Sequence, residues 1–149
     1  MDDKLTVVVL TNLDAGHSRP ENIERVVAGL VIPELMPKPS EAIADTKPEI
    51  AKRVHALIEE TIVGKDVSSY YSSEAHYHLD PNDAEDTRAS LPSGWANLPV
   101  LLIKRKEADG KTSSAFRIGN PGDARLIQTR TDAGGKFEIL VIQADPDNR

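Results

Sequence analysis

The stretch that decides the fold is the run Pro48-Glu49-Ile50-Ala51-Lys52-Arg53-Val54-His55-Ala56-Leu57-Ile58-Glu59-Glu60-Thr61-Ile62. Its large apolar residues recur three or four positions apart and form one stripe, made of Ile50, Val54, Leu57, Ile58 and Ile62. Thr46 is the expected N-cap, and Gly64 is a suitable left-handed stop. We therefore predict an amphipathic helix over residues 48–63, whose apolar face is buried against another element.

Downstream of this stretch, the pattern changes to short alternating runs separated by turn sequences. Asp-Gly, Pro-Gly and Gly-Gly pairs mark turns at residues 108–111, 120–123 and 132–136. Between them lie four expected strands, over residues 100–106, 112–118, 124–131 and 137–143. Helices first and antiparallel strands afterwards is the organisation of the α+β class. We predict a curved four-stranded antiparallel sheet that wraps around the helix.

The connection between this helix and the sheet contains two further helical signals. Tyr70 and Tyr71 favour a short helical turn, after which residues 75–79 are expected to be extended. Asp80 is a plausible cap for a third helix that ends near Ala89, and the acidic residues at its start suit the helix dipole.

Upstream, the chain begins with a strand and a helix. Residues 5–10 are rich in β-branched side chains and predict a strand that is buried on both faces. Ser18 and Glu21 have the spacing of a capping box, and the helix that they open is expected to stop at Pro33. The expected organisation is a strand–helix segment, a proline-rich linker, an α+β module and a polar tail, over residues 1–36, 37–47, 48–144 and 145–149.

Composition excludes several classes of function. The 149 residues include no cysteine, which rules out a disulfide framework, a cysteine-ligated metal site and a thiol nucleophile. The formal net charge of -6 disfavours binding to nucleic acid or to an anionic membrane, both of which need clustered basic residues. No apolar run approaches the ~20 residues of a membrane span, so no membrane segment is expected.

Two blocks of the sequence resemble known families. Leu5-Thr6-Val7-Val8-Val9-Leu10-Thr11-Asn12-Leu13, with the helical stretch Pro20 to Leu30 and then Leu35, looks like the last strand and C-terminal helix of the serine β-lactamase-like hydrolases. That group includes penicillin-binding proteins and esterases. The element order of residues 48–142 resembles the cystatin-like or nuclear-transport-factor-2-like cone. Modules of this kind can follow a β-lactamase-like domain.

The resemblance implies a non-catalytic C-terminal accessory module of a serine hydrolase, with a role in substrate access or association. The Ser-x-x-Lys and Tyr-x-Asn motifs of the hydrolase family are absent, so we expect no catalysis from this chain alone and a serine hydrolase as its parent. Lys111-Thr112-Ser113 superficially resembles the family's Lys-Thr-Gly strand motif, but it sits beside a predicted hairpin turn, downstream of where that motif belongs.

A second hypothesis is a ligand-binding module. Cone-shaped sheets of this kind often hold a pocket between sheet and helix, and aromatic side chains can line it. The candidate ligand-binding residues are Tyr70, Tyr71, Tyr77, Trp95 and His55. In a chain with only six aromatic residues, use of these side chains as core is the simpler interpretation.

A third hypothesis is a stand-alone enzyme of the cone fold in which His55, His76 or His78 is an acid–base group. The last two are two positions apart and could also chelate a divalent metal together with Glu74 or Asp80. A surface strand rich in tyrosine and histidine next to a loop explains the pair more simply, so we predict no metal and no cofactor.

The apolar N-terminal strand needs a partner, because its backbone groups must be paired when they are buried. We therefore expect a homodimer formed through the N-terminal strand and helix, and a small apolar ligand as a further partner. A complete chain would be cytoplasmic, whereas a piece of an exported hydrolase would be periplasmic or secreted.

Overall fold

The computed structural model describes residues 6–10, 20–35, 40–76, 78–120 and 122–145. The chain divides into two compact units, Met1–Pro39 and Ser40–Arg149, which are described separately below. The second unit holds the hydrophobic core cluster of the described residues.

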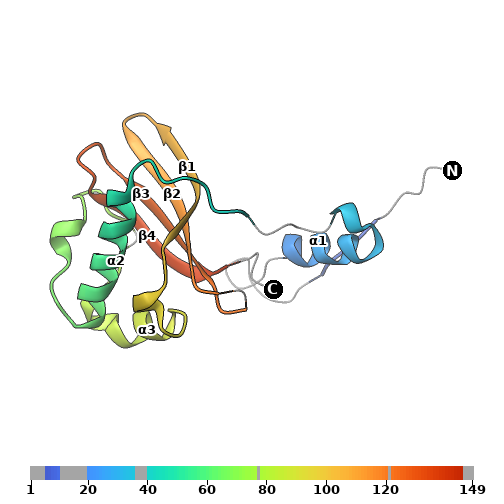
Figure 1. Cartoon of the computed structure of the whole chain (residues 1–149), viewed down its shortest axis with the longest axis horizontal. Helices are drawn as coiled ribbons and strands as arrows, with labels where there is room; N and C mark the ends of the chain where they lie inside the picture. Colours follow the sequence, from blue (N-terminus) through green and yellow to red (C-terminus); the bar gives the residue numbers. More distant parts are fainter. Residues whose placement is uncertain (1–5, 11–19, 36–39, 77, 121, 146–149) are drawn as a thin grey trace. The chain divides into compact units, whose positions relative to one another are not determined.

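The second unit is built on a four-stranded antiparallel sheet. Its strands are β1 (Leu101–Ala108), β2 (Lys111–Ile118), β3 (Arg125–Thr131) and β4 (Phe137–Ala144), in the spatial order β1-β2-β3-β4 (Figure 1). Every neighbouring pair is antiparallel, as short hairpin connections require. The predicted meander is therefore confirmed, and so is the α+β class.

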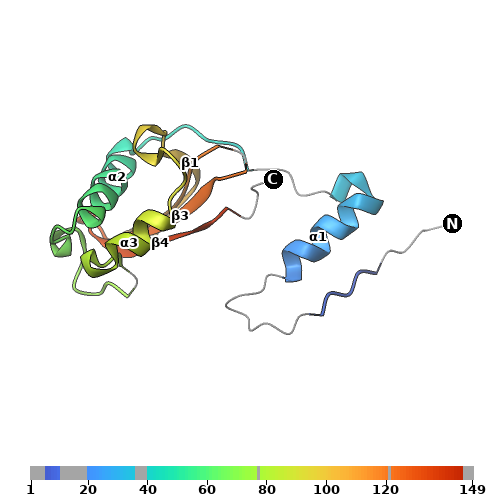
Figure 2. The ribbon, with the colours of Figure 1, turned by 90° about the horizontal axis from the view of Figure 1, so that it is seen from below.

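The helix α2 (Pro48–Ile62) lies across the inner face of this sheet, with α3 (Ala84–Ala89) on the same side (Figure 2). Val54, Leu57 and Ile58 of α2 are completely buried. They pack in one cluster with inward side chains of all four strands, which include Leu102, Phe116, Ile118, Ile127, Phe137 and Leu140. The predicted apolar stripe is thus the face that enters the core.

The N-terminal end of α2 differs from the prediction, whereas its C-terminal end agrees with it. The N-cap is Lys47 and not Thr46, and no side chain caps the helix. Pro48 occupies the first turn, where a missing N–H leaves no backbone donor unsatisfied, so the expected threonine cap is not needed. Gly64 does end the helix: its φ is +74° and its N–H donates to the Thr61 carbonyl at 3.0 Å.

The predicted third helix is split into a 3-10 turn at Pro81–Asp83 and the six-residue helix α3. Asp80 caps the first of them, because its carboxylate accepts a hydrogen bond from the Asn82 N–H at 2.8 Å. Two more 3-10 turns lie in the connections of this unit, Ser68–Tyr70 after α2 and Trp95–Asn97 between α3 and β1.

Residues 40–47, which the sequence assigned to a linker, belong to the second unit. The Ile43 N–H donates to the Leu102 carbonyl at 2.8 Å, so this segment covers the outer edge of β1. Asp45 accepts a hydrogen bond from the buried Arg105 guanidinium at 2.5 Å. At the opposite end of the module, Asp145 is buried and pairs with Arg117.

The first unit contains α1 (Pro20–Val31) followed by a 3-10 turn at Pro33–Leu35. The predicted helix is confirmed, while Ser18 of the expected capping box lies outside the described residues. Residues 6–10 form no strand, and the side chains of Val8 and Leu10 are 74% and 91% exposed. The expected buried strand is therefore not formed, because a strand needs a hydrogen-bonded neighbour and the described residues provide none.

None of the helices in the described part of the chain is both long enough and apolar enough to cross a membrane.

Candidate functional site

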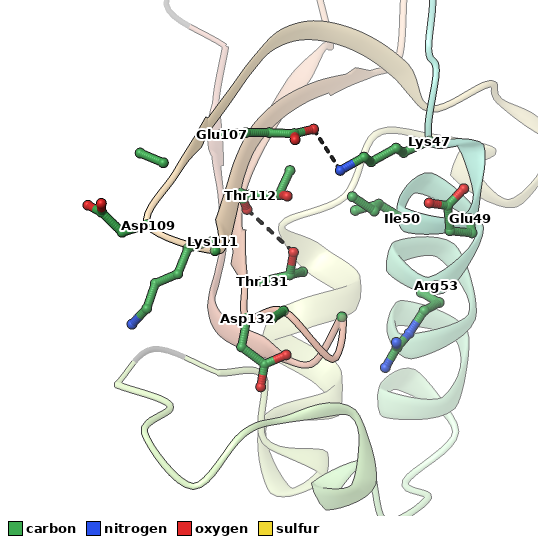
Figure 3. Close-up of a pocket in the computed structure, with 14 residues that line it drawn as sticks. Lys47, Glu49, Ile50, Arg53, Glu107, Asp109, Lys111, Thr112, Thr131 and Asp132 are labelled. Atoms are coloured by element: carbon green, nitrogen blue, oxygen red, sulfur yellow. Dashed lines mark hydrogen bonds and ion pairs between the residues drawn. The ribbon is translucent and has the colours of Figure 1, made fainter.

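A depression lined by described residues lies at one end of the module. It measures about 610 Å³ and opens between the first turns of α2 and the two hairpin turns that join β1 to β2 and β3 to β4 (Figure 3). The helix contributes Glu49, Ile50 and Arg53 to its lining. The hairpins contribute mostly polar and charged residues: Glu107, Asp109, Lys111, Thr112, Thr131 and Asp132. We call this depression the end cavity.

Two of the cationic groups in the end cavity are already paired with carboxylates. The Lys47 ammonium lies 2.7 Å from Glu107 and joins the start of α2 to the end of β1. The Lys111 ammonium lies 2.6 Å from Glu138, whose carboxylate also accepts a hydrogen bond from Arg130 Nε at 2.8 Å. These ion pairs link the hairpins to neighbouring segments, and they neutralise two of the positive charges that line the end cavity.

Glu138 and Lys111 shift each other's pKa. The hydrogen bonds that Glu138 accepts from Lys111 and Arg130 hold its pKa below the ordinary value, against the opposing effect of burial. The same hydrogen bond raises the pKa of Lys111. Both groups are thus held in their charged forms, which suits a structural pair and not a proton-transfer site.

Arg53 is the cavity cation that has no carboxylate partner among the described residues. Its guanidinium carbon lies 5.9 Å from the centroid of the Tyr70 ring and 5.7 Å from that of Phe137. These distances are typical of cation–π contacts, which orient a guanidinium without neutralising it. Arg53 extends from α2 beside the β3–β4 hairpin, where the Asp132 carboxylate accepts a hydrogen bond from the Lys136 N–H at 2.8 Å (Figure 3).

Of the described aromatic residues that were predicted to line a ligand pocket, none lines the end cavity, although the Arg53 guanidinium lies over the Tyr70 ring. Trp95 is buried, and its ring centroid lies 5.0 Å from that of His55. Tyr71 is buried against Phe137, and its hydroxyl accepts a hydrogen bond from the Leu79 N–H at 2.8 Å. Burial raises the pKa of Tyr71 to about 12. Tyr77 lies outside the described residues.

His76 and His78 are both exposed. They line a groove between β4 and α3, and the ring of His78 lies edge-on to Tyr71 at 5.4 Å. Within the described ranges, no group of three or more histidine and acidic side chains could hold a metal ion. His55 lies 3.8 Å from Glu59, one turn further along α2. The three histidines therefore do not converge on one site.

The sequence did not point to the end cavity. Its lining comes from the first turn of one helix and from two hairpin turns, which are more than 50 positions away along the chain. The turn sequences at residues 108–111 and 132–136 were recognisable, but only the packing of α2 shows that both meet the N-terminal end of the helix.

The chain matches no protein-family model, no curated protein and no solved structure, so the comparisons identify no family.

Proposed function

We propose that this chain is a non-catalytic accessory module of a β-lactamase-like serine hydrolase, attached to it through the first unit. The observation that carries this proposal is the apolar surface of that unit. The apolar stripe of α1, which includes Ile23, Val27, Leu30 and Val31, is exposed. An amphipathic helix normally buries such a stripe, so a partner surface is required.

Residues 6–10 add a second surface of the same kind. They read Thr-Val-Val-Val-Leu, a composition typical of a central strand, and they have no hydrogen-bonded neighbour among the described residues. A segment of strand-like composition followed by a helix with an exposed apolar stripe is compatible with the last elements of a hydrolase domain. This supports the resemblance of residues 5–35 to that fold.

The first test is genetic. The coding sequence upstream of the Met1 codon, or the neighbouring gene, should contain an in-frame Ser-x-x-Lys motif within a β-lactamase-like domain. Absence of that domain from both places would refute the proposal. A fluorescent penicillin should label the assembled hydrolase and leave this chain alone unlabelled, and labelling of the chain alone would show that it is catalytic.

The second test concerns the docking face. Val27→Asp should weaken attachment of the module to the hydrolase domain, because it places a charge in the apolar stripe of α1. Arg25→Gln is the matched control, since it also lowers the net charge by one unit and Arg25 is exposed on the opposite side of the helix. Equal effects of the two substitutions on co-purification would contradict docking through the stripe.

The end cavity favours a second function, the binding of a small ligand. The interior of the cone is filled by side chains such as Phe116 and Phe137, which are completely buried, so an apolar ligand has no space there. A polar ligand fits the end cavity better, with its anionic group on Arg53. Calorimetric titration with small dicarboxylates and amino acids, repeated on Arg53→Gln, would detect such binding, and an unchanged affinity of the variant would exclude this site.

A further inference from the structure

The outer face of the sheet is the side away from the helices of the second unit, because α2 and α3 both lie on the inner face (Figure 2). Successive side chains of a strand point to opposite faces. In β1, the Arg105 side chain is 8% exposed and pairs with Asp45, whereas Lys104 and Lys106 on either side of it are exposed. Two of the three charges in this basic run therefore lie on the outer face.

The register of the strands hollows the outer face above β2. Two neighbouring rows across β1, β2 and β3 each place a small side chain of β2 between two long ones. These rows are Lys104–Ala115–Gln128 and Lys106–Ser113–Arg130. Because directly opposite Cβ atoms are about 5 Å apart, the long side chains form two walls about 10 Å apart above a low floor. The resulting depression measures about 330 Å³, and we call it the outer trough.

The lining of the outer trough is positively charged. It includes Lys104, Lys106 and Arg130, and it includes no aspartate or glutamate. Neither lysine forms an ion pair with any described residue. The whole chain has a formal net charge of -6, so the outer trough has the opposite sign to the molecule. Such a local field attracts a small anion.

Arg130 is held in position on the β3 wall. Its Nε donates to the Glu138 carboxylate at 2.8 Å, and that carboxylate also pairs with Lys111. The terminal nitrogens of Arg130 make no hydrogen bond with any described residue, and neither does the hydroxyl of Ser113, the residue opposite on β2. A guanidinium that is already fixed at one nitrogen loses less side-chain entropy when its other nitrogens bind an anion.

We propose that the outer trough binds the phosphate group of a small ligand above Ser113. Lys106 and Arg130 donate to the phosphate from the two walls, and the Ser113 hydroxyl donates from the floor. Lys104 extends the positive charge along the trough. A phosphate monoester has a charge near -2 and three strong acceptor oxygens, which match these donors better than a single carboxylate does.

The same lining favours a small ligand over a nucleic acid. Proteins that bind single strands stack the bases on aromatic side chains, and the outer trough is lined by none. The negative charge of the rest of the chain also repels a long polyanion more than it repels one phosphate group.

The probes are glycerol 3-phosphate and inorganic phosphate, with glycerol as the uncharged comparison. In titrations of the full chain, both phosphates should give saturable shifts of the backbone amide signals of residues 104–106, 113–115 and 128–130, and glycerol should give none. Added sodium chloride should weaken the binding, because these charges are exposed. Tighter binding of the ester assigns an organic phosphate, and tighter binding of inorganic phosphate assigns the free ion; both outcomes support a phosphate site.

Two variants separate charge from shape. Lys106→Gln should weaken phosphate binding about threefold or more, because it removes one cation from the wall. Lys52→Gln is the matched control, since Lys52 is exposed on α2, on the other side of the sheet. Ser113→Val keeps every charge but fills the floor and removes the hydroxyl, so binding should be lost while a residue that favours strands preserves the sheet.

Three results would overturn the proposal. The first is the absence of a saturable shift at about 20 mM phosphate, which is about twentyfold above a dissociation constant of about 1 mM. The second is equal weakening by Lys106→Gln and Lys52→Gln, or unchanged binding by Ser113→Val, because the effect would then be one of net charge alone. The third is tighter binding of a six-nucleotide thymidine strand than of glycerol 3-phosphate. None of these measurements depends on what the first unit contacts.

Discussion

At the scale of single residues, the buried carboxylate of Glu138 is the most informative group. It is 2% exposed, yet it carries a charge that Lys111 and Arg130 neutralise. Buried charges are tolerated only when they are paired in this way. In the sequence it is simply a polar residue in a strand, because its partners lie on two other strands.

Glu138→Gln should lower the free energy of unfolding at neutral pH. The depressed pKa of Glu138 means that its contribution is present above the unfolded-state value of about 4.3 and is lost as the pH falls through the lower folded-state value. Urea denaturation at several pH values should therefore show that the difference between wild type and variant shrinks in acid. Glu74→Gln is the control, because Glu74 contacts Lys111 only from an exposed position. A difference that is constant with pH would contradict this assignment.

Tyr71→Phe should reduce stability by about 1 kcal/mol, because the Leu79 N–H loses its acceptor. The raised pKa of Tyr71 also makes the stability of the wild type depend on pH, in the direction opposite to that expected for Glu138. Above the unfolded-state pKa of about 10, the unfolded chain loses a proton that the folded chain retains, so stability falls as the pH rises toward about 12. Ultraviolet titration should show one tyrosine that ionises late in the wild type, and its persistence in Tyr71→Phe would assign it elsewhere.

Gly119→Ala should be more destabilising than Gly64→Ala, although both glycines have positive φ. A Cβ at Gly119 would lie 2.9 Å from the Ala124 Cα and 3.0 Å from the Asp123 carbonyl oxygen, which are backbone atoms, whereas a Cβ at Gly64 meets no atom within 4 Å. Thermal denaturation should show a loss of about 1 kcal/mol for Gly64→Ala and a larger loss for Gly119→Ala. Similar losses would indicate that the loop after β2 shifts easily.

At the scale of elements, α2 and the four strands could be predicted because each carries its periodicity within a few consecutive residues. The apolar stripe of α2 and the turns at residues 108–111 and 132–136 are local signals. The N-cap of α2 and the break before α3 were not predicted correctly. Helix ends depend on alternatives of nearly equal free energy, which the surrounding packing decides.

Leu57→Ala in α2 should destabilise the protein by about 3 kcal/mol, since Leu57 is completely buried between the helix and the sheet. Lys52→Ala, on the exposed face of the same helix, should change stability by less than about 0.5 kcal/mol. Both values come from chemical denaturation at constant pH. Comparable losses for the two variants would mean that α2 is not the central helix of the core.

At the scale of the whole molecule, the second unit should fold without the first. Every residue of the hydrophobic core cluster lies between Ile50 and Leu140. A fragment of residues 40–149 should therefore unfold cooperatively at a urea concentration close to that of the full chain, because stability comes from the apolar surface that the core buries. A fragment that begins at residue 48 should be less stable, since it lacks the Ile43 and Asp45 contacts with β1. Loss of the transition in the longer fragment would contradict this division.

The sequence by itself determined the class of the fold, the order of α2 and the four strands, and the apolar face of α2, because these follow from local periodicity and turn chemistry. Only the tertiary structure decided which polar residues meet at the end cavity and that the segment of residues 40–47 pairs with β1. Those features depend on contacts between segments that are distant along the chain. Their energies come from pairing and packing geometry, which no short window of residues contains.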